Sequence, residues 1–110
     1  MSKRDDAVSL HHMLDYAREA VVMAAGKSRR DFDRNRMLQL ALVRLVEVVG
    51  EAASRVSADT KEKRPDVPWS QIISTRNCLI HGYDVLDLDV LWDTIRSDLP
   101  EPISLLDKVV

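Results

Sequence analysis

One short stretch of the chain gathers four side chains that would act together on a phosphodiester. Arg76, Asn77, His81 and Tyr83 stand within eight residues. A guanidinium binds a phosphate bidentately and stabilises the charge of a transition state. An imidazole titrates near neutrality, so His81 would take the proton of a ribose 2′-hydroxyl or protonate the leaving oxygen. Asn77 would orient the imidazole or the substrate. The pattern therefore fits cleavage of a phosphodiester without a metal ion.

A structural interpretation of the same stretch stays open on spacing alone. Arg76 would then pair with Glu47 or Glu51, and His81 and Tyr83 would be ordinary residues at the end of a helix. The histidines and carboxylates of the chain lack the usual spacing of metal ligands. The sequence therefore predicts neither a metal nor another cofactor.

Helical geometry limits how this stretch can form a site. On one helix Asn77 and His81 are four residues apart and share a face. Arg76 and His81 are five apart and project about 140° from each other. Either the helix ends near His81, as Gly82 indicates, or a second copy completes the site. In a two-fold dimer two such stretches would line one shared cleft.

Composition narrows the class of protein. The 110 residues carry a net charge of -2, and aromatic residues make up only 5%. An RNA contact would thus need a local patch of positive charge, because the chain as a whole is acidic and offers few rings for stacking on bases. Cys78 is the only cysteine. The sequence has neither a run long enough to span a bilayer nor the apolar core of a signal peptide. We expect a soluble cytoplasmic protein that contacts neither membrane nor DNA.

Apolar residues recur with helical spacing along nearly the whole chain. Residues 1–110 are therefore predicted to form a single all-α domain, an antiparallel bundle of four longer helices and a short C-terminal helix. The first helix would bury a face that includes Leu10, Met13, Leu14 and Ala17, and Gly26 would stop it. Pro100 and Pro102 would break the chain before the last helix, and Asp87 would cap the helix before it. The predicted helices cover residues 5–25, 34–56, 69–80, 88–99 and 103–109.

The second predicted helix is apolar over most of its circumference. One small domain offers few neighbours to cover such a helix, so we expect a second copy of the chain to pack against it. Glu47 and Glu51 lie on its narrow polar stripe. They would either face the cleft and raise the pKa of His81 or form ion pairs with Arg44 or Arg76.

A basic cluster lies in and after a predicted charged loop at residues 27–31. Such a cluster is usually a solvated surface, and otherwise it would guide RNA or meet a protein partner. Its members are Lys27, Arg29, Arg30, Arg34 and Arg36.

Several segments together resemble one family. Arg76, His81 and Tyr83 match the R-x4-H-x-Y motif of the HEPN superfamily, and the similar branch is that of HepT toxins in HepT–MntA toxin–antitoxin pairs. The resemblance covers nearly the whole chain in order and spacing. Glu101 and Pro102 depart from it in the tail. The other matching segments are Gly50-Glu51-Ala52, Val67-Pro68-Trp69, Trp92 to Ile95 and Asp98-Leu99-Pro100.

The resemblance implies a homodimeric ribonuclease toxin of a type VII-like pair. Arg76 and His81 would be catalytic, with Asn77 in support. The implied partner is a small MNT-type nucleotidyltransferase that transfers AMP to Tyr83 and so neutralises the toxin. The RNA substrate stays open between tRNA and mRNA.

Two other functions remain possible from the sequence. The chain could be a non-catalytic substrate-binding or target subunit of a small nucleotidyltransferase, which its acidic balance favours. It could also be a structural helical dimer without any link to nucleotides, if the matching segments were a coincidence.

Overall fold

The computed structural model describes residues 3–81 and 85–108, and at residues 3, 4, 76, 78, 80 and 81 it describes the backbone alone. This part of the chain is helical apart from connections and one short hairpin, which confirms the predicted all-α class. None of its helices is long and apolar enough to cross a bilayer. In chain order the elements are α1 (Lys3–Ala24), α2 (Arg29–Asp33), α3 (Arg36–Arg55), α4 (Ala58–Lys63), α5 (Trp69–Cys78), β1 (Ile80–His81), β2 (Val85–Leu86), α6 (Leu88–Asp93), the π-helix η1 (Thr94–Asp98) and α7 (Pro100–Asp107).

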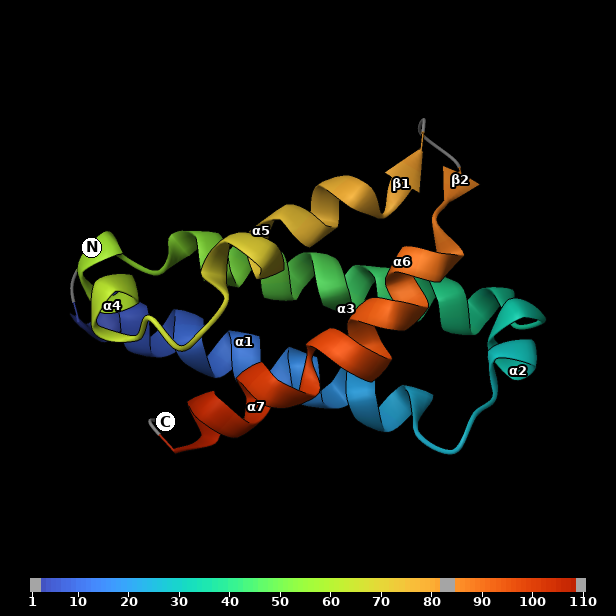
Figure 1. Cartoon of the computed structure of the whole chain (residues 1–110), viewed down its shortest axis with the longest axis horizontal. Helices are drawn as coiled ribbons and strands as arrows, with labels where there is room; N and C mark the ends of the chain where they lie inside the picture. The colour runs from blue at the N-terminus through green and yellow to red at the C-terminus, as the bar shows by residue number, and fades with distance from the viewer. Residues whose placement is uncertain (1–2, 82–84, 109–110) are drawn as a thin grey trace.

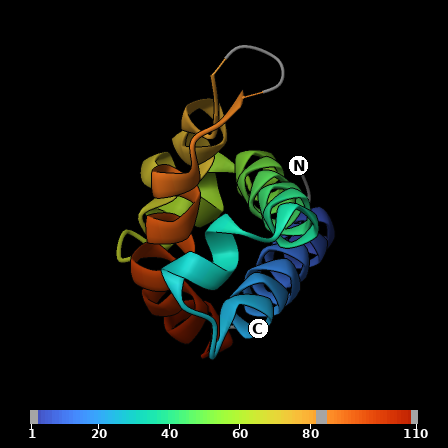
Figure 2. The same cartoon turned by 90° about the vertical axis from the view of Figure 1, so that its right-hand side faces the viewer.

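The helices form an elongated body around α3. Helices α1 and α5 pack on two sides of α3, and the run α6–η1–α7 crosses the front of the molecule (Figure 1). The molecule measures 42 × 30 × 19 Å. Helix α4 and both termini lie at one end of the long axis, whereas α2 and the β1–β2 hairpin lie at the other (Figure 1). The view along that axis shows the hairpin rising above the helices (Figure 2).

Helix α1 presents the predicted apolar face to the core. Leu10, Met13, Leu14 and Ala17 are buried at helical spacing. Gly26 stops the helix, as predicted, with a φ of +75°. This left-handed conformation is strained for other residues and costs glycine little.

Helix α3 is buried mainly by its own chain. Ten of its residues are buried, and α1 and α5 supply the largest contacts. The single chain thus buries half of the twenty residues of α3, and the packing of a second copy against the rest of the helix stays a prediction. The open side of α3 includes Met37, 82% exposed, and Leu40, 48% exposed.

A short helix replaces part of the predicted charged loop. Ser28 begins α2 with a capping box, in which its hydroxyl accepts from the backbone N–H of Asp31 and the Asp31 carboxylate accepts from the N–H of Ser28. These hydrogen bonds satisfy two N–H groups that the first turn would leave open. Helix α3 then begins at Arg36, two residues later than predicted, with Asn35 as its cap.

A buried carboxylate ties α1 to the connection after α3. Asp6 is 5% exposed and accepts from the Ser57 N–H at 2.9 Å, the Ser57 hydroxyl at 2.6 Å and the Thr60 hydroxyl at 2.5 Å. These hydrogen bonds lower the pKa of the Asp6 carboxyl to about 2. Because Ser57 is also the N-cap of α4, the contact fixes both the start of α4 and its place beside α1.

The C-terminal helices form one nearly continuous run. Asp87 caps α6 as predicted, by accepting from the N–H of Val90 at 3.0 Å. The run continues as a π-turn, in which the N–H of Leu99 donates to the carbonyl of Thr94 at 2.9 Å. Helix α7 begins at Pro100, so the predicted start at residue 103 is wrong. Prolines 100 and 102 fall in the first turn, where a helix needs no N–H donor.

Candidate functional site

Helix α5 carries the first half of the Arg76–Tyr83 stretch and is anchored at its N-terminal end. Trp69 is buried, and its indole N–H donates to the carbonyl of Arg64 at 2.9 Å. One turn later Ile72 is buried and lines an apolar recess with Val46 and Val49 of α3. These contacts fix the axis of α5 against the central helix, which sets where its last turn emerges.

The last turn of α5 contains Arg76 and Asn77, and the helix ends at Cys78. The predicted extension to residue 80 is therefore wrong, and so is the shared helical face of Asn77 and His81. His81 lies instead in β1, where it pairs with Val85 of the antiparallel strand β2. This break supports the first of the two alternatives, that the helix ends near His81. The backbone at His81 therefore does not follow the axis of α5.

The structure describes these functional residues unequally. Asn77 is exposed. The side chains of Arg76 and His81, and all of Tyr83, lie outside the described part. Their assigned roles therefore stay predictions, and the geometry that bears on them is that of the surrounding backbone.

The base of the hairpin is held closely on both strands. Leu79 directly precedes β1 and is completely buried, and its carbonyl accepts from the N–H of Asp87 at 2.6 Å. Asp87 directly follows β2 and caps α6. One residue thus closes the hairpin with its backbone and starts the next helix with its side chain, so the hairpin and α6 take their positions together.

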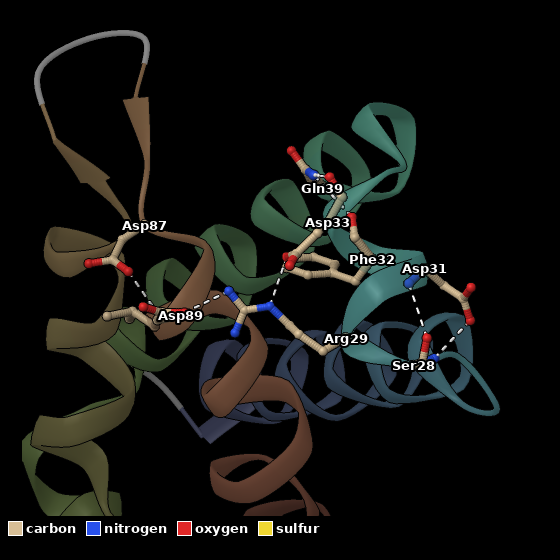
Figure 3. A network of polar contacts seen from close by, with 9 residues as sticks. Ser28, Arg29, Asp31, Phe32, Asp33, Gln39, Asp87 and Asp89 are labelled. Atoms are coloured by element: carbon tan, nitrogen blue, oxygen red, sulfur yellow. Dashed lines mark hydrogen bonds and ion pairs between the residues drawn. The ribbon is translucent and has the colours of Figure 1, made fainter.

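A polar network connects this region to α2 (Figure 3). The Arg29 guanidinium donates to Asp33 at 2.8 Å and to Asp89 of α6 at 2.6 Å. The hydrogen bond to Asp33, as the larger cause, and the one to Asp89 raise the pKa of Arg29. Beneath them Phe32 is fully buried, with its ring 5.0 Å from that of Trp92. An ion pair above an aromatic pair therefore holds α2 against α6.

Gln39 fixes the other side of α2. Its amide group is buried and donates to the carbonyls of Phe32 and Asp33 at 3.0 and 3.1 Å. These carbonyls stand at the C-terminal end of α2, where that of Phe32 also accepts from the N–H of Asn35 at 3.2 Å. The amide thereby ties the end of α2 to α3, as the labelled side chains in Figure 3 show.

A groove with acidic groups runs between α5 and the α6–η1 segment. Asp98 is half-buried there, and burial together with the neighbouring Asp93 raises its pKa. Neither Asp93 nor Asp98 was predicted as a site residue. The Asp98-Leu99-Pro100 segment was the available signal, but helical spacing cannot reveal a π-turn. The groove is lined by Gln71, Ser74, Thr75, Val90, Asp93, Thr94 and Asp98.

The comparison with protein families identifies the chain. A family model described as ribonuclease HepT-like matches residues 13–109. The chain belongs to the HepT-like ribonuclease family. The matched region includes the whole Arg76–Tyr83 stretch, so the resemblance read from the motifs is confirmed.

Curated relatives agree with this family. The HepT-like chain is 35% identical over 101 residues to "Putative RNase MJ1380" of Methanocaldococcus jannaschii, which spans 92% of this chain and 93% of the relative. It is 37% identical over 79 residues to "Probable ribonuclease HepT" of Thermococcus cleftensis, which spans 72% of each. No solved structure gives a significant match.

The two predicted cleft acids of the HepT-like chain lie on the polar side of α3. Glu47 is half-buried, and its carboxylate is 3.9 Å from the guanidinium of Arg44, the structural alternative expected for it. Glu51 pairs with Arg55 at 3.0 Å and lines a groove between α3 and α1. Within one chain, therefore, Glu51 lies on the side of α3 that faces α1. A place in a cleft shared by two copies stays a prediction.

The described residues also bear on metal binding. Among the side chains that the structure describes, which exclude those of Cys78 and His81, no three or more histidine, cysteine or carboxylate groups come together in a way that could hold a metal ion. The carboxylates Asp93 and Asp98 face the groove as a pair only.

Proposed function

We propose that this HepT-like chain is a metal-independent endoribonuclease toxin that acts as a homodimer and is neutralised by AMP transfer to Tyr83. The observation that carries the proposal is the family match over residues 13–109, which contains Arg76, Asn77, His81 and Tyr83 at the family's spacing. The change from helix to hairpin between Arg76 and His81 supports it, because a single straight helix would point the two side chains apart.

The proposed chemistry is an internal transfer at phosphorus. The ribose 2′-oxygen attacks the neighbouring phosphorus and loses its proton to an imidazole, while the bond from phosphorus to the 5′-oxygen breaks and that oxygen gains a proton. Arg76 binds the non-bridging oxygens and stabilises the added negative charge. His81 serves as the base or the acid, because its ordinary pKa lies near neutrality. Asn77 orients one of these groups.

Dimerisation would bring two such motifs to one cleft. The open side of α3 supports a contact between copies, since Met37 and Leu40 are large apolar side chains left to solvent in the single chain. Sedimentation of the purified protein tests this part. A chain that sediments as a monomer at all concentrations would remove the shared cleft from the proposal.

Growth and RNA integrity test the ribonuclease activity. Cells expressing the wild-type chain are expected to stop growing and to accumulate cleaved RNA, and the purified protein should cleave RNA in the presence of a chelator. His81→Ala should abolish both effects. His11→Ala is the matched control, because His11 is an exposed imidazole on α1, outside the motif. Equal toxicity of the wild type and His81→Ala would contradict the proposal.

AMP transfer to Tyr83 is the proposed means of neutralisation. The phenol oxygen attacks the α-phosphorus of ATP, a new oxygen–phosphorus bond forms, and pyrophosphate leaves. The added phosphate places negative charge beside the motif and repels an RNA phosphate. The partner is an MNT-type nucleotidyltransferase.

Intact-mass measurement tests this step. Incubation with the nucleotidyltransferase and ATP should add mass in multiples of AMP to the wild type and to Tyr16→Phe. Tyr83→Phe should gain none. Tyr16 and Tyr83 are the only two tyrosines, so this pair of variants covers both phenols of the chain. A mass gain on Tyr83→Phe would assign the modification to another group.

The second candidate is a binding subunit of such a nucleotidyltransferase without its own cleavage activity. The net charge of -2 favours it, because an acidic chain repels a polyanionic substrate. Co-purification with the enzyme, together with intact RNA after incubation with the free chain, would support this function in place of the first.

A further inference from the structure

Positive charge is concentrated in one segment of an acidic chain. Residues 27–36 hold five cationic side chains and two carboxylates, a net charge of +3, whereas the whole chain has a net charge of -2. The rest of the molecule is therefore distinctly acidic. A polyanion that approached this protein would find its favourable field mainly at α2 and the start of α3.

The charges in this segment are not equally available. Arg29 is engaged by Asp33 and Asp89 and holds α2 against α6. Asp31 is engaged by the N–H of Ser28, which with the Ser28 hydroxyl lowers its pKa and keeps it a cap of α2. Two carboxylates and one arginine of the segment are thus used within the fold.

Three arginines remain free for an external partner. Arg30, Arg34 and Arg36 are exposed, and within the described residues their side chains form neither a hydrogen bond nor an ion pair, although the charge of Arg34 helps to lower the pKa of Asp31. They stand on the short corner from α2 into α3, whose shape is fixed by the Ser28 cap and by Gln39. Three guanidinium groups on a rigid corner lose less freedom on binding than three on a mobile loop would.

The position of this corner relative to the motif is the second observation. Helix α2 and the β1–β2 hairpin lie toward the same end of the long axis (Figure 1), and across that axis the hairpin rises above the helices while α2 lies below it (Figure 2). The Arg29–Asp89 bond joins α2 to α6, and α6 begins one residue after Asp87, which closes the hairpin (Figure 3). The free arginines therefore have a fixed position relative to the backbone that carries His81.

We propose that Arg30, Arg34 and Arg36 form a phosphate-binding face that holds single-stranded RNA next to the Arg76–Tyr83 motif. The inference rests on the proposed ribonuclease function and adds the surface by which an acidic protein would bind its substrate. Guanidinium groups bind phosphates and carboxylates alike in a bidentate way, so the groups themselves fit RNA as well as an acidic protein, and the position of the corner decides for RNA. RNA is the partner that must reach this end of the molecule for cleavage to occur.

Salt dependence of RNA binding tests the face directly. The parent is the His81→Ala chain, which does not consume the probe, and the probe is a labelled single-stranded oligouridylate. Replacing Arg30, Arg34 and Arg36 by Gln should reduce the slope of log affinity against log salt by about 2, since each phosphate contact on a single strand contributes about 0.7. In dilute salt the affinity should fall by about tenfold to a hundredfold.

A charge-matched variant controls for net charge. Arg55→Gln, Lys63→Gln and Lys108→Gln remove three cations from the ends of α3, α4 and α7, at the other end of the molecule (Figure 1). This variant should change the slope by less than about half a unit. If both triple variants weaken binding equally, net charge alone explains the effect and the face is refuted.

Further outcomes separate this inference from the proposed function. The α2 variant is the chain in which Arg30, Arg34 and Arg36 are replaced by Gln. If the wild-type chain cleaves no RNA but the His81→Ala parent binds RNA and loses that binding in the α2 variant, the ribonuclease is refuted and the RNA-binding face is kept. Binding that is absent in the parent, or unchanged by the α2 variant, overturns the face. Polyglutamate is the probe for an acidic protein. If the α2 variant loses binding to polyglutamate but not to RNA, the corner is a protein-docking site and the proposal is wrong.

Discussion

At each end of the molecule one charged side chain joins two helices, but one of these contacts is buried and the other is exposed. At the end with the termini, the Asp6 carboxylate accepts three hydrogen bonds and is 5% exposed. At the end with the hairpin, the Arg29 guanidinium donates to two carboxylates, but its side chain is 38% exposed and that of Asp89 is 82% exposed. Both contacts tie together elements that are distant in the sequence. They differ in how much water and salt can compete with them.

Because of this difference in burial, the Asp6 contact stabilises the fold, whereas the Arg29 contact mainly orients a surface. A buried charge-assisted contact is screened little, whereas an exposed ion pair contributes about 1 kcal/mol or less. The hairpin end therefore depends on the aromatic pair of Phe32 and Trp92 for its stability. Arg29, above that pair, contributes little stability and mainly orients α2 against α6. This suits an end of the molecule whose cations are proposed to bind a polyanion.

Phe32→Ala should have the largest effect on the hairpin end. Phe32 is completely buried, and removal of a buried phenylalanine ring costs about 3–5 kcal/mol because a cavity is left behind. Urea unfolding measures this loss. Phe32→Leu is the milder control and should lose markedly less. A loss below about 1 kcal/mol for Phe32→Ala would mean that α2 is not anchored by its ring.

Asp6→Asn should have the next largest effect, with a defined pH dependence. The Asp6 carboxyl has a pKa of about 2 in the folded chain against 3.8 ordinarily. A lowered pKa stabilises the fold above the ordinary value, and this contribution is lost as the pH falls through about 4 toward 2. Thermal unfolding between neutral pH and pH 2 should therefore show a steeper acid decline for the wild type than for Asp6→Asn.

Asp59→Asn is the matched control for that experiment. Asp59 lies on α4 between Ser57 and Thr60, which bind Asp6, but its carboxylate is exposed and, within the described residues, pairs with Lys63 alone. Its removal should leave the acid decline as in the wild type. If Asp6→Asn and the wild type lost stability in parallel, the hydrogen bonds from Ser57 and Thr60 would not be the source of the effect.

Local chemistry explains which parts of the fold could be predicted. The buried face of α1, the stop at Gly26 and the cap at Asp87 each depend on residues within one or two turns, and all three predictions were confirmed. The end of α5 was misplaced because Leu79 and Ile80 are as apolar as a continuing helix would require. The end follows instead from a tertiary bond, between the carbonyl of Leu79 and the N–H of Asp87.

The residue types of the candidate site come from the sequence alone, and the structure adds the backbone that surrounds them. Helical angles predicted either a break between Arg76 and His81 or a second copy, and the structure shows that α5 ends at Cys78. The sequence shows the basic cluster but does not indicate that its members have different roles. Sequence alone could not separate Arg29 from Arg30, because the separation depends on Asp89, which lies 60 residues further along the chain.

Arg29→Gln should have a smaller effect on stability than on activity. The lost ion pairs are exposed, so the free energy of unfolding should fall by only about 0.5–1 kcal/mol. RNA cleavage by the otherwise wild-type chain should fall further, since α2 would lose its bond to the helix that closes the hairpin. Asp89→Asn removes the same contact from the other side. If the double variant is as impaired as either single one, the shared contact is responsible.

Glu51→Gln should have the smallest effect and decides a role left open for the polar side of α3. Glu51 pairs with Arg55 of its own helix on an exposed surface, so its loss should cost no more than about 0.5 kcal/mol. Unlike Arg29, it ties no second helix. The pH profile of RNA cleavage is the sharper measurement, because a carboxylate near His81 would raise the pKa of that imidazole. An unchanged profile places Glu51 with the structural ion pairs. A profile moved toward lower pH would bring Glu51 into the active site, and it would then have to come from the second copy, because in its own chain Glu51 lines the groove on the α1 side of α3.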